Sequence, residues 1–324
     1  MAKDISETKR PRRRPSSAGN ADDGLRTLAE PAAIYAMGEA PLRADAVPAS
    51  DHLSAAHMAE TNGGGALENV PGFDALRARN AGLFPLVQTR LAPTVDAEGF
   101  TAENIIGNVD NLVAIPDTTA LPWRCIAMLS ITYADGAKAT GTAWFMGPKA
   151  LGTAGHNIHH QAHGGATEIL VSPAFDGVAA PFGTYRVHQT YCDPGWLAGT
   201  QDAALDFGVL VLKEEGVGQR LGWFGFAAYE SKQLDRLLLN VSGYPVDRSN
   251  RTQHYNGGRV EDVERKFLRY TFDTVGGMSG SPIFALFGQQ RIVVGIHTSG
   301  NARANRARRI DRGLYDVLAR FAGS

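Results

Sequence analysis

The chain has 324 residues, of which 44% are apolar and 20% are charged, an ordinary composition for a globular protein. Its 32 Lys and Arg nearly balance its 33 Asp and Glu, so the whole chain carries no charge excess that would draw it to nucleic acid or to an anionic membrane. No stretch approaches the roughly 20 apolar residues that a membrane-spanning helix needs, and we therefore expect neither nucleic-acid nor membrane partners.

Residues 1–104 differ in composition and in hydrophobic pattern from the rest of the chain. They are rich in Ala, Asp, Glu, Arg and Pro and lack alternating apolar runs. The sequence therefore predicts a largely disordered leader or propeptide, in which Phe73–Leu83 could form a short helix. The basic run Arg10–Arg14 is typical of a solvated tail, with a nucleic-acid or partner patch as the alternative. No apolar run follows these basic residues, so no secretory signal peptide is recognisable.

From residue 105 onward, short apolar runs alternate with Gly, Pro and Asp. Arg124–Tyr133 and Gly141–Met146 flank Asp135-Gly136, a pair that favours a hairpin turn. Apolar residues in Ile310–Phe321 recur at helical spacing and predict a C-terminal amphipathic helix. The pattern favours an antiparallel barrel or sandwich. The further strands that we expect are Glu168–Ser172, Thr184–Gln189, Phe207–Leu212, Leu237–Ser242, Phe267–Phe272, Ser281–Leu286 and Ile292–His297.

The chain has two cysteines, Cys125 and Cys192. They are either a disulfide pair, which would suit an oxidising compartment, or two small buried hydrophobic residues. The sequence leaves both interpretations open.

The segment Gly276–Pro282, which reads GGMSGSP, has Ser279 at its centre. A serine hydroxyl is a weak nucleophile, so it needs a tight turn, a nearby base and preorganised hydrogen-bond donors. Glycines on both sides of Ser279 allow the N–H groups of Gly277 and Ser279 to point at one oxyanion. The alternative is a glycine-rich turn between two strands.

Two further segments supply a base and an acid. His156 ends the run Gly152–His156 and could take the proton of Ser279, because histidine titrates near pH 7. Three more histidines follow closely, but no Cys or carboxylate follows at ligand spacing, so we expect no metal site. Asp206 precedes the apolar run Phe207–Leu212, where a buried carboxylate needs a partner such as histidine. Asp202 is the competing acid.

His, Asp and Ser follow one another in the order of the chymotrypsin-type catalytic triad. With these residues the chain resembles the bacterial glutamyl endopeptidase group of trypsin-like serine proteases. The resemblance implies two six-stranded antiparallel β-barrels over residues 105–324, with the active site between them and the leader before them. The segments that carry it are Ile105–Asn108, Asp117–Thr119, Pro122–Arg124, Thr153–His156, Asp206-Phe207, Gly243–Pro245, Gly276–Pro282 and Gly295–His297.

The resemblance implies a monomeric serine endopeptidase that cleaves protein or peptide substrates after Glu or Asp and needs no cofactor. A trypsin-like protease of other specificity and an inactive trypsin-fold binding module are the alternatives. The group is typically secreted or periplasmic, although this chain shows no recognisable signal peptide. Asn157 stands where many members have a disulfide-bonded Cys, so that bond is absent here.

The substrate-binding residues are also implied by the resemblance. Thr274 and His297 match the hydroxyl and imidazole that hold a substrate carboxylate in the group. Asp273 falls where trypsin carries the acid that binds Arg or Lys, although Asp also occurs there within the group. Ile105 begins a segment that resembles the start of mature members. We therefore expect an activating protease to cut between Asn104 and Ile105, after which the Ile105 ammonium would insert near the active site.

Overall fold

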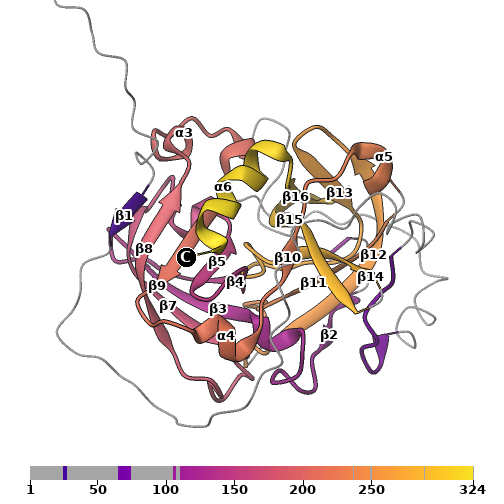
Figure 1. Cartoon of the computed structure of the whole chain (residues 1–324), viewed down its shortest axis with the longest axis horizontal. Helices are drawn as coiled ribbons and strands as arrows, with labels where there is room; N and C mark the ends of the chain where they lie inside the picture. The colour runs from indigo at the N-terminus through magenta and orange to yellow at the C-terminus, as the bar shows by residue number, and fades with distance from the viewer. Residues whose placement is uncertain are drawn as a thin grey trace, which may run out of the picture.

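The structure, a computed structural model, describes residues 25–27, 65–73, 105–106, 110–235, 237–248, 250–287 and 289–323. Its strands form two closed six-stranded antiparallel barrels, which lie side by side in Figure 1. This confirms the fold that the sequence resemblance implied.

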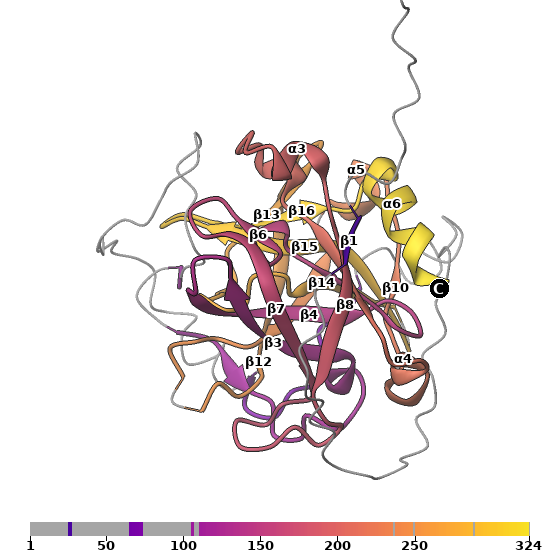
Figure 2. The same cartoon turned by 90° about the vertical axis from the view of Figure 1, so that its left-hand side faces the viewer.

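The first barrel closes where β7 pairs with β8. In sheet order its strands are β3 (Ile126–Tyr133), β4 (Lys138–Phe145), β5 (Ala150–Thr153), β9 (Gly208–Leu212), β8 (Tyr185–Cys192) and β7 (Gly164–Pro173). The short strand β6 (His159–His160) extends this sheet beside β7. Figure 2 turns this barrel toward the viewer.

The second barrel closes where β15 pairs with β16. In sheet order its strands are β14 (Pro282–Phe287), β11 (Leu238–Gly243), β12 (His254–Val263), β13 (Phe267–Tyr270), β16 (Asn305–Arg309) and β15 (Gln290–Gly300). Two short strands add to it: β10 (Gly225–Phe226) runs parallel to β15, and β2 (Val113–Ala114) pairs with β12.

Among the described residues, the helices lie in the connections between strands or after the last strand. They are η1 (Trp123–Cys125), η2 (Gly155–Asn157), α3 (Pro194–Leu197), η3 (Ala203–Leu205), α4 (Val217–Leu221), α5 (Ser231–Leu234) and α6 (Arg312–Ala322). Helix α6 follows the last strand of the second barrel yet packs on β5 and β9 of the first (Figure 1). Its apolar face explains this position, because Leu314 and Leu318 are buried there.

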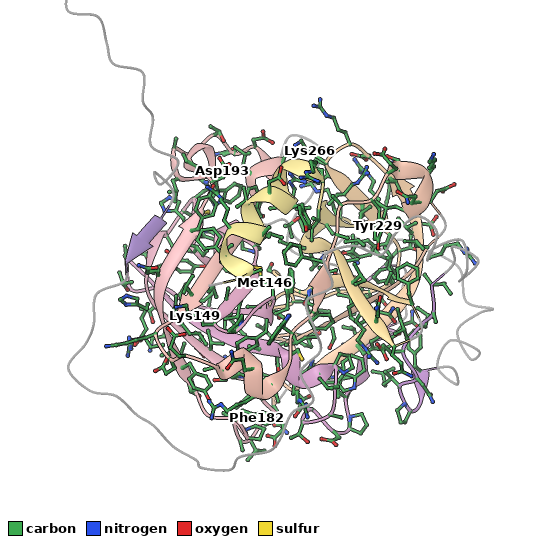
Figure 3. All side chains as sticks on the ribbon, in the orientation of Figure 1. Met146, Lys149, Phe182, Asp193, Tyr229 and Lys266 are labelled. Carbon is green, nitrogen blue, oxygen red and sulfur yellow. The ribbon has the colours of Figure 1, made fainter. Side chains whose placement is uncertain are left out.

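Each barrel encloses an apolar core, and a third cluster joins them. Leu129 and Leu210 belong to the core of the first barrel, whereas Val241 and Ile283 belong to that of the second. The joining cluster takes Trp144 and Met146 from the first barrel, Phe284 and Ile296 from the second, and Leu314 and Leu318 from α6. Figure 3 shows Met146 beside α6, where the two barrels meet. Among the described residues, no helix is both long and apolar enough to cross a membrane.

Every strand expected from the sequence lies within or overlaps an observed one, and the predicted hairpin is β3–β4. The sequence patterns did not predict β5, β12 and β16. Cys125 belongs to the joining cluster and Cys192 to the core of the first barrel, and no disulfide joins them. They are therefore the buried thiols of the second interpretation.

Two pieces of the predicted leader contact the barrels. Strand β1 (Leu25–Thr27) pairs with β8 at the edge of the first barrel. Residues 65–73 lie on the second barrel, where Ala66 bridges to Leu286 of β14. The expected helix Phe73–Leu83 lies outside the described residues, apart from Phe73.

Candidate active site

Asp206 and His156 form a close pair at one end of the first barrel. The turn η3 ends at Leu205 and delivers Asp206 just before β9, while η2 carries His156. The imidazole Nδ1 lies 2.9 Å from Oδ2 and 3.1 Å from Oδ1 of Asp206, and the His156 N–H donates to Oδ1 at 2.9 Å. A carboxylate on Nδ1 keeps the hydrogen there, which leaves Nε2 able to accept a proton.

The competing acid, Asp202, lies elsewhere. It is exposed, and its carboxylate caps η3 by accepting the Ala204 N–H at 2.9 Å. The structure therefore brings Asp206, and not Asp202, to His156. The Tyr133 hydroxyl also donates to the His156 carbonyl at 2.8 Å, which fixes the turn that carries the imidazole.

Ser279 sits in a tight turn before β14. Met278 N–H donates to Val275 O at 3.0 Å and Ser281 N–H donates to Met278 O at 2.9 Å. Gly277 and Gly280, on either side, have φ of +94° and +89°, a region that residues with a Cβ rarely adopt. A Cβ at Gly280 would lie 2.1 Å from the Thr142 carbonyl oxygen. The glycines that marked this motif in the sequence are therefore required by the turn itself.

The first barrel holds the Ser279 turn directly. The Ser279 carbonyl accepts from Thr142 N–H and from the Asn157 side-chain amide, both at 2.9 Å. Asn157 also donates to Thr153 Oγ1 at 2.9 Å. Because Asn157 follows His156, one buried amide ties the histidine turn to the serine turn. Asn157, at the position where the sequence resemblance implied a cysteine in many members, thus makes a polar link in this chain.

The peptide groups before Ser279 are fixed on both sides. Gly276 O accepts from Val246 N–H at 2.7 Å, and Gly277 O accepts from the Thr142 hydroxyl at 2.8 Å. The N–H and C=O of a trans peptide point in opposite directions, so the Gly277 N–H points away from Val246. Thr142 was not predicted as a site residue, since threonines in strands are common and carry no motif.

His297 is tied to the same turn by its backbone. Gly280 N–H donates to His297 O at 2.7 Å, and His297 N–H donates to Ser281 O at 2.9 Å. The imidazole is fully buried, and its Nδ1 lies 2.5 Å from the Tyr270 hydroxyl. Burial, with a smaller contribution from His156, lowers the pKa of His297 to about 3. We therefore assign a neutral ring, which carries one N–H and is held at Nδ1 by the Tyr270 hydroxyl.

Thr274 and Asp273 differ in their surroundings. Thr274 is fully buried, and its hydroxyl makes no hydrogen bond to the described part of the chain. Asp273 is also buried, but it accepts from Ile106 N–H at 2.7 Å, Asn111 N–H at 2.8 Å and Asn111 Nδ2 at 3.1 Å. Desolvation raises the pKa of Asp273 to about 6, against the lowering effect of these donors. Asp273 therefore holds the segment that begins with Ile105.

Arg308 also lies close to the candidate site, and the sequence patterns did not predict it. Only 3% of its side chain is exposed, and its Nε donates to Ala204 O at 2.6 Å, two residues before Asp206. Asp311 balances its charge at 3.1 Å. Strand β16 of the second barrel thus holds the turn that delivers Asp206. Nothing in the local sequence distinguishes Arg308 from the other arginines near it.

The three histidines that follow His156 closely, His159, His160 and His163, are half-buried on the first barrel. His163 contacts Asp135 at 2.8 Å and stacks on His160 with ring centroids 4.6 Å apart. Within the described ranges, no group of three or more His, Cys, Asp or Glu residues is placed to hold a metal ion.

Comparison with known proteins places the chain in a family. No family model matches it. The glutamyl endopeptidase of Bacillus licheniformis is 31% identical over 234 residues, which are 69% of this chain and 71% of that protein. The chain belongs to the glutamyl endopeptidase family of trypsin-like serine proteases. It is therefore a serine peptidase, and its substrates are proteins or peptides.

Two further known proteins match a similar share of the chain. A Bacillus subtilis protein named extracellular metalloprotease is 30% identical over 68% of this chain and 70% of its own length. A solved glutamyl endopeptidase structure superposes with a TM-score of 0.59 and 22% identity, covering 68% of this chain and 99% of that one. At that identity the superposition shows the shared fold, and the fold is that of the glutamyl endopeptidase family.

Proposed function

We propose that this protease is a glutamyl endopeptidase in which Ser279 is the nucleophile, His156 the base and Asp206 the orienting acid. The observation that carries the proposal is the His156–Asp206 pair, whose turn Asn157 ties to the Ser279 turn. His156 takes the hydroxyl proton as Ser279 attacks the scissile carbonyl, and Asp206 stabilises the imidazolium. The N–H groups of Gly277 and Ser279 hold the oxyanion, each contributing about 3 kcal/mol. Water then hydrolyses the acyl-enzyme.

The environment of the pocket residues supports a preference for Glu. Both oxygens of Asp273 accept hydrogen bonds, one from Ile106 and the other from Asn111, so this carboxylate already has partners and is not available to bind a basic substrate side chain. Thr274 and His297 instead offer a hydroxyl and a ring N–H, which are the donors that a buried carboxylate requires. The Tyr270 hydroxyl contacts Nδ1 and holds the imidazole of His297 in place. Asp before the scissile bond is the second-best residue in this proposal.

The first test uses a fluorophosphonate probe, which labels a serine activated by a base. We expect the wild-type protein to be labelled on Ser279 and Ser279→Ala to remain unlabelled. Asn69→Ala, which changes an exposed residue, serves as the matched control. Absence of labelling in the wild type, at full incubation and with a folded sample, would favour an inactive binding module.

The start of the active protease is a further part of the proposal. Ile106 already donates its N–H to buried Asp273, so a cut between Asn104 and Ile105 would place the new ammonium one residue from this anchor. An ammonium there would offset both the Asp273 charge and that of a bound substrate carboxylate. We expect activity to rise as the intact mass falls to that of residues 105–324. Full activity in uncut chain would show that activation needs no cleavage.

A further inference from the structure

Residues 65–73, which we call the docking segment, contact the second barrel through paired backbone and side-chain groups. Ala66 N–H donates to Leu286 O at 2.9 Å, as a strand partner would. Asn240 of β11 donates to Ala66 O at 3.0 Å and accepts the Glu68 N–H at 2.8 Å. Asn240 is fully buried, and the Tyr255 hydroxyl also donates to its Oδ1 at 2.8 Å. These hydrogen bonds fix the Asn240 amide in one orientation, in which its Nδ2 faces Ala66 O and its Oδ1 faces the Glu68 N–H.

A buried ion pair fixes the middle of the docking segment. The Glu68 carboxylate receives two N–H groups of Arg291, from Nε at 2.5 Å and from Nη2 at 2.9 Å. The two side chains are 8% and 15% exposed. A bidentate pair of this kind requires one geometry, and removal of either partner leaves a poorly solvated charge.

Two apolar side chains complete the contact. Val70 and Phe73 are 5% and 2% exposed and belong to one cluster with Trp123 and Tyr255. The rings of Phe73 and Tyr255 meet edge to face with centroids 4.9 Å apart. Buried aromatic anchors beside a desolvated charge pair are the features that carry most of the affinity in specific protein interfaces.

We propose that the docking segment is a permanent part of the protease, and that it stays bound to the second barrel after the chain is cut at any point between residues 74 and 105. The processed protein is then a complex of two noncovalently associated chains. The contacts above are made with Asn240, Tyr255 and Arg291, and Thr274, Ser279 and His297 are not among their partners. The surface formed by Asn240, Tyr255 and Arg291 recognises a peptide with a Glu and with apolar residues two and five positions after it.

The test uses full-length Ser279→Ala protein, which cannot cut itself, with a recognition sequence for an added protease inserted after Arg90. After complete cleavage, the sample is passed through a size-exclusion column and the peak is analysed by mass spectrometry. We expect the fragment that contains the docking segment to elute with the barrels in native buffer and apart from them in denaturant. Separate elution in native buffer would overturn the proposal.

Variants show whether the docking segment is responsible. Glu68→Lys places a lysine beside Arg291, so that like charges meet. A fragment that carries both Glu68→Lys and Phe73→Ala should bind the barrels about a hundredfold more weakly. Asn69→Lys adds the same charge to an exposed neighbour and should change nothing. Glu68→Arg combined with Arg291→Glu restores opposite charges and should recover binding, which separates a lost contact from a misfolded barrel. Retention of the fragment by the Glu68→Lys, Phe73→Ala protein would mean that another segment, such as β1, holds it.

Discussion

Replacing Ser279 or His156 by Ala is expected to lower kcat by about 10⁶-fold, and Asp206→Ala by about 10⁴-fold. Removal of Ser279 deletes the attacking oxygen, whereas removal of His156 leaves a hydroxyl that water cannot deprotonate efficiently. Asp206 acts through His156, to which it makes three close contacts, so its loss costs less. Because the three residues act together, a double variant should be no slower than the worse single variant. The measurement is kcat on a peptide with Glu before the scissile bond.

The control for this series is Asp202→Asn. Asp202 is exposed and caps η3, so its amide variant should keep full activity. Circular dichroism and thermal unfolding show whether each variant is folded. Wild-type activity in Asp206→Ala together with loss of activity in Asp202→Asn would show that the acid is wrongly assigned.

Replacing His297 by Ala is expected to lower kcat/KM for Glu substrates by about 10²- to 10³-fold. The imidazole is buried, so its loss leaves a substrate carboxylate in a dry pocket without its donor. Thr274→Val, which keeps the shape and removes the hydroxyl, should cost about tenfold for the same reason. Neither change should affect substrates with Ala before the scissile bond, because they place no charge in the pocket. Peptides that differ only at that residue provide the measurement.

Tyr270→Phe refines this prediction. It removes the hydroxyl that lies 2.5 Å from Nδ1, so the imidazole of His297 loses the contact that holds it in place. We expect about a tenfold higher KM for Glu substrates with kcat nearly unchanged, since Tyr270 acts through His297. Faster wild-type cleavage after Arg than after Glu would contradict the proposed pocket. An unchanged preference in His297→Ala would contradict it equally.

Sequence patterns could identify those parts of the candidate site whose signal is local. Ser279 is flanked by glycines that its turn requires, and Asp206 precedes a run whose burial makes a lone carboxylate unfavourable. Strands with apolar runs were found for the same reason. Strand β12 was missed because it contains Gly257-Gly258 and three charged residues, and β16 because it reads NRARR. Their strand character comes from pairing with neighbours, which no local pattern records.

Residues that act over long range in the sequence could not be predicted. Asn157 contacts the Ser279 carbonyl across 122 positions, and Arg308 contacts Ala204 across 104. Their residue types are common at surfaces, and only the folded chain shows that they are buried and paired. The same holds for Glu68 and Arg291, which are 223 positions apart. The composition of residues 1–104 predicts disorder because it is an average over the whole segment. It does not reveal the few residues that contact the second barrel.

The apolar cluster between the barrels has a mechanical consequence. Trp144, Phe284 and Leu318 are completely buried in it, and together they represent both barrels and α6. Opening the barrels like a hinge would expose these side chains to water, at about 25 cal/mol for each Å² of apolar surface. The proposed catalytic groups, which both barrels carry, are therefore held in a rigid frame. For the same reason, we expect the two barrels to lose their structure together in a single cooperative transition.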